Sequence, residues 1–170
     1  MATILTTDRL TLRRFEPTDA RLVADHLGNW NVCSKLSSVA YPYTLELAEK
    51  WIASHATSPN INCAIETDGQ LIGCIAQDTE FGYWLAEPFW GQGIMTEAAR
   101  AFVSYLFRSQ RMDSLRASYF KDNPASGAVL HYCGFTATGE SKIFCLARNT
   151  EVERIDMTTT RHVWEQTVGH

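Results

Sequence analysis

One segment restricts the fold of this chain more than any other: a strand-like run, a glycine turn and a helical run follow one another directly. Residues 80–86 are rich in aromatic and apolar side chains, Gly91 and Gly93 lie in the turn, and residues 96–109 repeat apolar side chains every three or four positions. A helix with one apolar face needs a sheet or another helix to cover that face. The segment therefore predicts a sheet with at least one helix packed on it.

The same turn indicates a place where an anion can bind. The first N–H groups of a helix have no partner within the helix and lie at the positive end of its dipole. Gly91 and Gly93 have no Cβ atom to keep phosphate oxygens from the backbone, and Thr96 adds a hydroxyl donor. A purely structural turn is an equally good interpretation of this pattern alone. The P-loop and dinucleotide-binding patterns do not occur.

The rest of the chain predicts strands and helices in mixed order, an α/β (α+β) class. Asp68-Gly69 predicts a tight hairpin turn, Thr44 predicts a helix N-cap, and the aromatic segment Trp30–Tyr43 predicts an irregular loop. Apolar positions in 150–160 slip once in phase, which leaves the register of that strand open. The other expected strands are 9–15, 61–66, 71–77, 114–119 and a strand from Phe135, and the other expected helices are 17–29, 44–58 and 123–134.

Length and charge exclude several classes of protein. A chain of 170 residues fits one domain, which we expect to span 1–170. The net charge of −4 argues against sequence-independent binding to nucleic acid, which needs clustered Lys and Arg. No apolar run approaches the roughly 20 residues of a membrane span, and residues 1–15 lack the apolar core of a signal peptide. We therefore expect no membrane association and a cytoplasmic location.

The cysteine and histidine pattern predicts neither disulfides nor a metal site. The five cysteines are odd in number and contain no C-x-x-C pair, and the five histidines have no spacing typical of a metal site. We expect buried, reduced thiols. The cysteines are Cys33, Cys63, Cys74, Cys133 and Cys145.

Four motifs, in order along nearly the whole chain, resemble those of the GCN5-related N-acetyltransferases (GNAT), in particular the branch of ribosomal-protein-alanine N-acetyltransferases. They are Thr7–Arg13, Gly82–Leu85, Trp90–Ala98 and Asn123–Phe135. Three positions depart from the general pattern. Trp90 stands where Gln or Arg is usual, Met95 where a small residue is usual, and Leu130 where many members carry a Tyr.

The resemblance implies a mostly antiparallel, twisted sheet flanked by helices, with a parallel, splayed strand pair at the cofactor site. It implies direct transfer of acetyl from acetyl-CoA to an amine, with no acetyl-enzyme and no metal. Backbone N–H groups of Tyr83, Trp84 and Leu85 would polarise the thioester carbonyl. The implied cofactor-binding residues are Tyr83, Trp84, Leu85, Gly91, Gln92, Gly93, Ile94, Met95, Thr96 and Asn123.

Two side chains are the candidates for proton transfer. The resemblance makes Ser126 the group that protonates the departing thiolate, with Asn123 positioning it or bonding the pantetheine, although an Asn before Pro124 is also a typical helix cap. Glu80 is the candidate base for the amine, and it shares a strand face with Gly82 and Trp84. A solvated surface charge is the alternative interpretation of Glu80.

The sequence is compatible with more than one kind of acceptor. We expect a protein N-terminal amine, with a small-molecule amine (a polyamine or an antibiotic) and a non-catalytic acyl-CoA-binding domain as alternatives. Aromatic side chains can line the acceptor slot, although such residues are more often part of a core. Both a monomer and a homodimer remain open. The candidate aromatic residues are Trp30, Tyr41, Tyr43 and Trp51.

Overall fold

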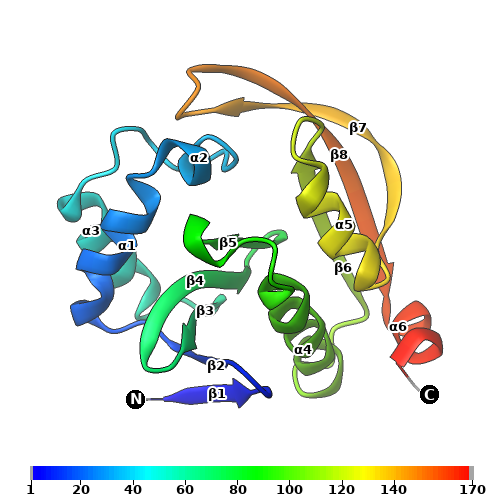
Figure 1. The fold of residues 1–170 in the computed structure, drawn as a ribbon. Helices are drawn as coiled ribbons and strands as arrows, with labels where there is room; N and C mark the ends of the chain where they lie inside the picture. Colours follow the sequence, from blue (N-terminus) through cyan, green and yellow to red (C-terminus); the bar gives the residue numbers. More distant parts are fainter. Residues whose placement is uncertain (1, 169–170) are drawn as a thin grey trace.

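A computed structural model, which describes residues 2–168, contains one eight-stranded sheet (Figure 1). The strand order is β1-β2-β3-β4-β5-β6-β8-β7, and every neighbouring pair is antiparallel except β5 and β6. This confirms the predicted mixed sheet with one parallel pair. The strands are β1 (Thr3–Thr6), β2 (Thr11–Arg14), β3 (Ile61–Thr67), β4 (Gln70–Gln77), β5 (Phe81–Leu85), β6 (Ser114–Phe120), β7 (Thr136–Cys145) and β8 (Thr150–Thr160).

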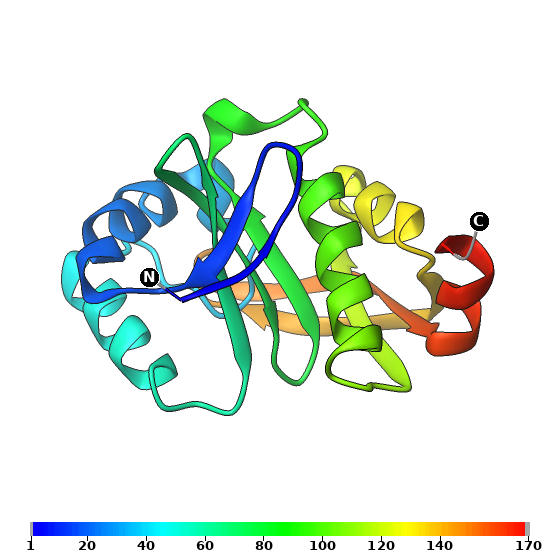
Figure 2. The ribbon, with the colours of Figure 1, turned by 90° about the horizontal axis from the view of Figure 1, so that it is seen from below.

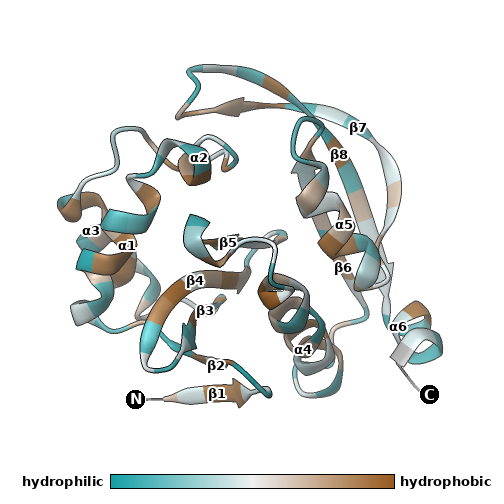
Figure 3. Cartoon of the chain, viewed as in Figure 1, coloured by the Kyte–Doolittle hydropathy of each residue, from teal (hydrophilic) through white to brown (hydrophobic). Residues whose placement is uncertain are grey.

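Helices cover both faces of the sheet, with α1 and α3 on one side and α4 and α5 on the other (Figure 2). Neighbouring residues of β3 take part in opposite cores, because side chains alternate along a strand: Ile65 packs with α4, and Ala64 packs with α1 and α3. A strand such as β4 is therefore apolar along most of its length (Figure 3). The helices are α1 (Ala20–Leu27), α2 (Trp30–Cys33), α3 (Leu45–His55), α4 (Ile94–Arg108), α5 (Pro124–Tyr132) and α6 (Arg161–Val168).

Several sequence predictions hold at the level of single residues. Asp68 and Gly69 have φ values of 49° and 77°, the left-handed conformation that a two-residue hairpin turn needs. The Thr44 side chain accepts a hydrogen bond from the Leu47 N–H and caps α3. The register of the predicted tail strand is set by its pairing with β6 and β7. β7 shifts register between Ala137 and Gly139 where it pairs with β8.

Other predictions were wrong in their bounds or missed an element. The first predicted strand starts at Thr11 because Thr7 to Leu10 form a turn closed by a bond from Thr7 N to Leu10 O, and β1 precedes that turn. Helix α4 begins at Ile94, two residues before the predicted start. The segment predicted as an irregular loop contains α2, whose N-cap Asn29 accepts the N–H of Asn31. The sequence analysis also missed α6.

The sheet divides between β5 and β6, which share a single bridge, Phe81 to Ala117. Past that bridge the two parallel strands separate toward their carboxyl ends, the usual place for a ligand in such sheets. The β7–β8 hairpin arches back over this gap toward α2 (Figure 1). There the Leu146 N–H donates to Ser37 O over 3.0 Å and Arg148 Nε donates to Ser34 O over 2.7 Å, so the two halves of the molecule touch again.

In residues 2–168 none of the helices combines the length and the apolar character that crossing a membrane requires.

Candidate functional site

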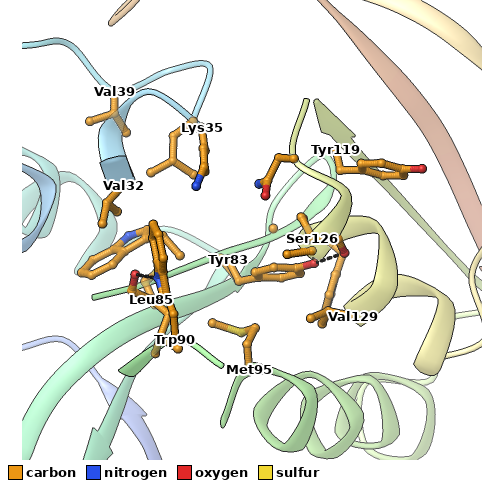
Figure 4. A pocket seen from close by; sticks show the side chains of 18 of the residues that line it. Val32, Lys35, Val39, Tyr83, Leu85, Trp90, Met95, Tyr119, Ser126 and Val129 are labelled. Carbon is orange, nitrogen blue, oxygen red and sulfur yellow. Dashed lines mark hydrogen bonds between the residues drawn. The ribbon is translucent and has the colours of Figure 1, made fainter. Parts of the chain in front are cut away.

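A cavity of about 690 Å³ occupies the gap between β5 and β6. It reaches from the apolar surface beside α1, α2 and α3, past β5, to the glycine turn before α4 and the first turn of α5. Figure 4 shows its side chains. Every residue predicted for proton transfer or cofactor binding lines this cavity except Gln92, so the structure brings together residues that are far apart in the sequence.

Strand β5 divides the cavity into two sides, because its successive side chains point to opposite faces. Tyr83 packs against the core that contains α4 and α5, whereas Trp84 packs against the core that contains α1 and α3. Glu80 and Gly82 also line the cavity, as predicted for the Trp84 face, although Glu80 lies just before the strand begins.

The backbone of β5 offers only part of the predicted set of N–H donors. Ala86 N donates to Ile72 O over 2.8 Å, and alternation along an antiparallel pair then turns the Trp84 N–H toward β4 as well. The N–H groups of Tyr83 and Leu85 face the gap. The Leu85 carbonyl accepts the Trp90 indole N–H over 2.7 Å. The inclusion of Trp84 as a backbone donor was therefore wrong.

The glycine turn leaves a row of backbone donors free. Gly91 and Gly93 both adopt left-handed φ values, 73° and 71°, and Gly93 is the N-cap of α4 without a side-chain cap. Within residues 2–168, the N–H groups of residues 91–96 have no hydrogen-bond acceptor. Several adjacent free N–H groups at a helix N-terminus form an anion cradle. A Cβ on either glycine would add strain, because L side chains rarely adopt such φ values.

The turn is tied to the N-terminal strands by contacts that the sequence analysis missed. Arg9 Nη1 donates to Gln92 O over 2.9 Å, and Arg9 Nε bonds Glu97 Oε2 over 2.6 Å. Thr7 Oγ1 donates to Glu97 Oε1 over 2.6 Å. Partial burial raises the pKa of Glu97, but the hydrogen bonds from Thr7 and Arg9 outweigh it and hold this pKa below its usual value.

Ser126 and Tyr83 form a close pair at the wall of the cavity (Figure 4). Tyr83 Oη lies 2.9 Å from Ser126 Oγ and 2.8 Å from the Ser126 carbonyl oxygen, to which it donates. Burial raises the pKa of Tyr83, and the bond with Ser126 offsets only part of that rise, so the phenol is protonated at neutral pH. Tyr83 was predicted to act through its backbone, and nothing in the sequence indicated this role of its side chain.

Asn123 occupies the N-cap position of α5, yet its side chain makes no capping hydrogen bond. The cap interpretation of this side chain was therefore wrong. The side chain lines the cavity instead. Leu130, at the position where a Tyr is usual, is buried in the core and cannot offer a hydroxyl.

Glu80 is the only Asp or Glu among the described residues that line the cavity. Its Oε2 accepts the Ser118 hydroxyl over 3.2 Å and lies 3.5 Å from Arg154 Nη1. Arg154 also pairs with Asp156 over 3.2 Å. The carboxylate is thus held by a polar network and is not a freely solvated charge.

The predicted aromatic slot is only half formed. Tyr43 and Trp51 line the cavity, whereas Trp30 and Tyr41 contact each other at a ring distance of 4.9 Å and lie outside it. Apolar side chains complete the cavity on this side, and the single Lys in its lining, Lys35, places Nζ 4.3 Å from the centre of the Trp90 ring. The apolar lining residues on this side are Val23, Leu27, Val32, Leu36 and Val39.

All five cysteines are buried and free. Burial raises the pKa of Cys33 to about 11 and that of Cys63 and of Cys133 to about 12. Cys74 is the one cysteine in the cavity lining of the described chain, and burial raises its pKa as well. These four thiols are protonated at neutral pH and are therefore poor nucleophiles.

Comparison with known proteins agrees with this arrangement. The [ribosomal protein uS5]-alanine N-acetyltransferase of Escherichia coli is 27% identical over 84% of this chain and 82% of its own length. The ribosomal-protein-S5-alanine acetyltransferase from Vibrio fischeri superposes with a TM-score of 0.80 at 18% identity, covering 94% of this chain and 97% of that one. The spermidine N-acetyltransferase from Vibrio cholerae, solved with CoA and spermine, superposes with a TM-score of 0.76 at 21% identity, covering 93% and 99%.

One ribosomal-type and one polyamine-type solved structure share this fold. A family match extends from just before the second strand to the first residue of β7. Residues 9–136, which include β5, the glycine turn and α5, match the acetyltransferase (GNAT) domain. The chain therefore belongs to the GNAT acetyltransferase family.

Proposed function

We propose that this N-acetyltransferase moves the acetyl group of acetyl-CoA directly to the N-terminal amine of a protein. The observation that carries the proposal is one continuous cavity that joins the anion cradle before α4 to an apolar chamber beyond β5. A thioester that is anchored by its pyrophosphate on the first side can present its carbonyl to an amine on the second. Holding both reactants in this way is a large part of catalysis.

The residues would act as follows. The free N–H groups of residues 91–96 hold the pyrophosphate, and Asn123 bonds the pantetheine. The N–H groups of Tyr83 and Leu85 stabilise the oxyanion that forms when the amine nitrogen bonds the carbonyl carbon. Glu80 takes a proton from the amine, directly or through water. The C–S bond then breaks, and the sulfur takes a proton from Ser126, directly or through water, while the Ser126 hydroxyl regains a proton from solvent.

Charge favours a protein N-terminus over a polyamine as the acceptor. A polyamine carries several positive charges, whereas the described cavity lining offers one carboxylate, Glu80, which already pairs with Arg154, and one cation, Lys35. A neutral, apolar first residue with a single amine fits the apolar side chains beside α2 better. The relatives that act on ribosomal-protein alanine support the same class of acceptor.

Release of free CoA thiol from acetyl-CoA tests the proposal, with short peptides of apolar N-terminal residue compared with the same peptides blocked at the N-terminus and with spermidine. We expect turnover with the free peptides alone. Tight CoA binding without turnover on any amine would favour a non-catalytic binding domain, and turnover of spermidine or an aminoglycoside alone would favour the small-molecule alternative.

Calorimetry on Gly93→Val tests the cradle separately. The positive φ of Gly93 strains any β-branched residue, and its side chain would occupy the turn, so CoA affinity should fall strongly while the circular dichroism spectrum stays unchanged. Unchanged affinity in a folded variant would refute the placement of the pyrophosphate.

A further inference from the structure

The N-terminal motif Thr7–Arg13 has no part in the proposed chemistry, yet the Arg9 side chain reaches the glycine turn and the Thr7 side chain reaches the first turn of α4. Arg9 bonds the carbonyl of Gln92, in the middle of the turn, and the carboxylate of Glu97, in the first turn of α4. Glu97 is further held by Thr7 Oγ1 and by the Arg9 backbone N–H, the latter over 3.1 Å. One guanidinium thus connects the turn to the helix that follows it.

A turn that contains two glycines needs such support. Glycine loses more conformational freedom on ordering than any other residue, and Gly91 and Gly93 both sit in left-handed conformations. The Thr7–Leu10 turn, which carries Arg9, is itself held in place by hydrogen bonds and by burial of Leu10. Thr7 N donates to Leu10 O and Leu10 N donates to Thr7 Oγ1, and the Leu10 side chain is buried in the core.

We propose that Arg9 and Glu97 are positioning residues, which hold the Gly91–Met95 turn in the conformation that receives the pyrophosphate of the cofactor. This inference rests on the proposed placement of CoA. Arg9 acts through the Gln92 carbonyl, which it fixes on the side of the turn away from the cavity. Gln92 is the one member of the turn that does not line the cavity. With that carbonyl held, the neighbouring N–H groups remain directed to the ligand.

The charge of Glu97 allows a positioning role to be distinguished from simple electrostatic attraction of the anionic cofactor. Arg9 Nη2 lies 3.7 Å from the place that a Cβ on Gly93 would take, so the guanidinium stands beside the turn and adds positive potential there. A carboxylate in the first turn of α4 has the opposite effect and repels an anionic ligand. If charge alone mattered, removing the Glu97 charge would strengthen CoA binding. If Glu97 anchors Arg9 and the turn, the same change weakens binding.

The experiment measures the Kd for CoA by calorimetry in the full chain and in Arg9→Ala, Arg9→Lys and Glu97→Gln. The control is Arg21→Ala, because Arg21 is well exposed and, within residues 2–168, pairs only with Asp25 on its own helix at 3.8 Å. We expect each of the three test variants to raise Kd about tenfold, since each breaks at least one charge-assisted hydrogen bond. Arg9→Lys should not retain the wild-type affinity for CoA, because an ammonium group cannot bridge Gln92 O and Glu97 in the geometry of a guanidinium. The KM for the acceptor peptide should stay at the wild-type value in all of them.

Tighter CoA binding by Glu97→Gln, full rescue by Arg9→Lys, or an unchanged Kd in Arg9→Ala would overturn the positioning role. A rise in acceptor KM that matches the rise in CoA Kd would do the same, because it would indicate general damage to the fold. Failure of the wild-type chain to bind CoA would instead refute the proposed function, so the two failures are distinct.

Discussion

Tyr83 Oη lies 2.9 Å from Ser126 Oγ, which joins a side chain of β5 to the first turn of α5 across the cavity wall. Because Tyr83 donates its single proton to one acceptor at a time, the arrangement of this pair decides where the Ser126 proton points. When Tyr83 donates to the Ser126 carbonyl, the serine hydroxyl donates to Tyr83. When Tyr83 donates to Oγ, the serine hydroxyl is free to donate into the cavity, where we propose that the sulfur lies.

Removing either hydroxyl should therefore affect the same step. We expect Ser126→Ala to lower kcat about 100-fold, within the usual range for a general acid, and Tyr83→Phe to lower it by a similar factor. The double variant should lose little more than either single variant, since both changes disable one unit. The Tyr83→Phe change keeps the ring in place, so the affinity of this variant for CoA should be unchanged. That affinity is the control. Wild-type kcat in both single variants would leave proton delivery to water.

Glu80→Gln should change the pH–rate profile in a direction different from Ser126→Ala. A base is most needed at low pH, where the amine is protonated, so the rate of Glu80→Gln should fall most on the acid side and recover toward alkaline pH. Arg154→Gln provides the comparison, because it removes the cation that pairs with Glu80 but keeps the carboxylate. A parallel drop at all pH values would assign Glu80 to structure and not to proton transfer.

No cysteine should carry the acetyl group. Burial keeps the Cys74 thiol protonated although it lines the cavity, and direct transfer needs no thiolate. Mass spectrometry after incubation with labelled acetyl-CoA should find no stoichiometric acetyl-cysteine, and Cys74→Ala should keep its kcat within a few-fold. An acetyl-Cys74 that disappears as product forms would contradict direct transfer.

The Arg13 network should contribute to stability and not to catalysis. Arg13 is buried and forms a bidentate bond with Asp19 at 2.8 and 2.9 Å and a bond with Glu66 at 2.7 Å. Arg13→Leu leaves two carboxylates without their partner, so the free energy of unfolding in urea should fall by about 3–5 kcal/mol. Arg21→Ala, in an exposed pair, should cost at most about 1 kcal/mol. Equal losses would show that burial of the pair is unimportant.

Stability should also depend on pH through Glu97. Its pKa is lower in the folded protein than in the unfolded chain, so its contribution is complete above the unfolded value of about 4.3 and disappears as pH falls through the folded value. In that acid range the wild type should lose more unfolding free energy than Glu97→Gln. Glu49→Gln, at an exposed position, should follow the wild type. Identical acid profiles for all three proteins would contradict this.

Local patterns in the sequence were sufficient where local chemistry decides the outcome. Asp68-Gly69 can adopt left-handed φ values, and Thr44 can cap a helix, whatever the rest of the chain does. The strand, glycine turn and helix between Phe81 and Arg108 were found for the same reason. The family resemblance supplied the arrangement of the sheet, because the pairing of β5 with β6 joins segments that no short-range pattern connects.

Contacts between distant residues explain what was missed. Nothing near Tyr83 in the sequence indicates that its hydroxyl meets Ser126, 43 positions away. The bond between Arg9 and Glu97 joins residues 88 positions apart, and a charged pair of that kind has no periodicity to reveal it. The sequence pattern at Asn123 is compatible with a cap, but the side chain makes no capping hydrogen bond and the residue lines the cavity.

Strand β5 sets a limit on how relatives of this chain can change in length during evolution. Tyr83 and Trp84 face opposite sides of the cavity only because they are neighbours on an extended strand. Deleting or inserting one residue between Phe81 and Tyr83 would exchange the two sides, so that the phenol would meet the acceptor and the indole would meet α5. The spacing within β5 is therefore fixed by the two different surroundings that its neighbouring side chains occupy.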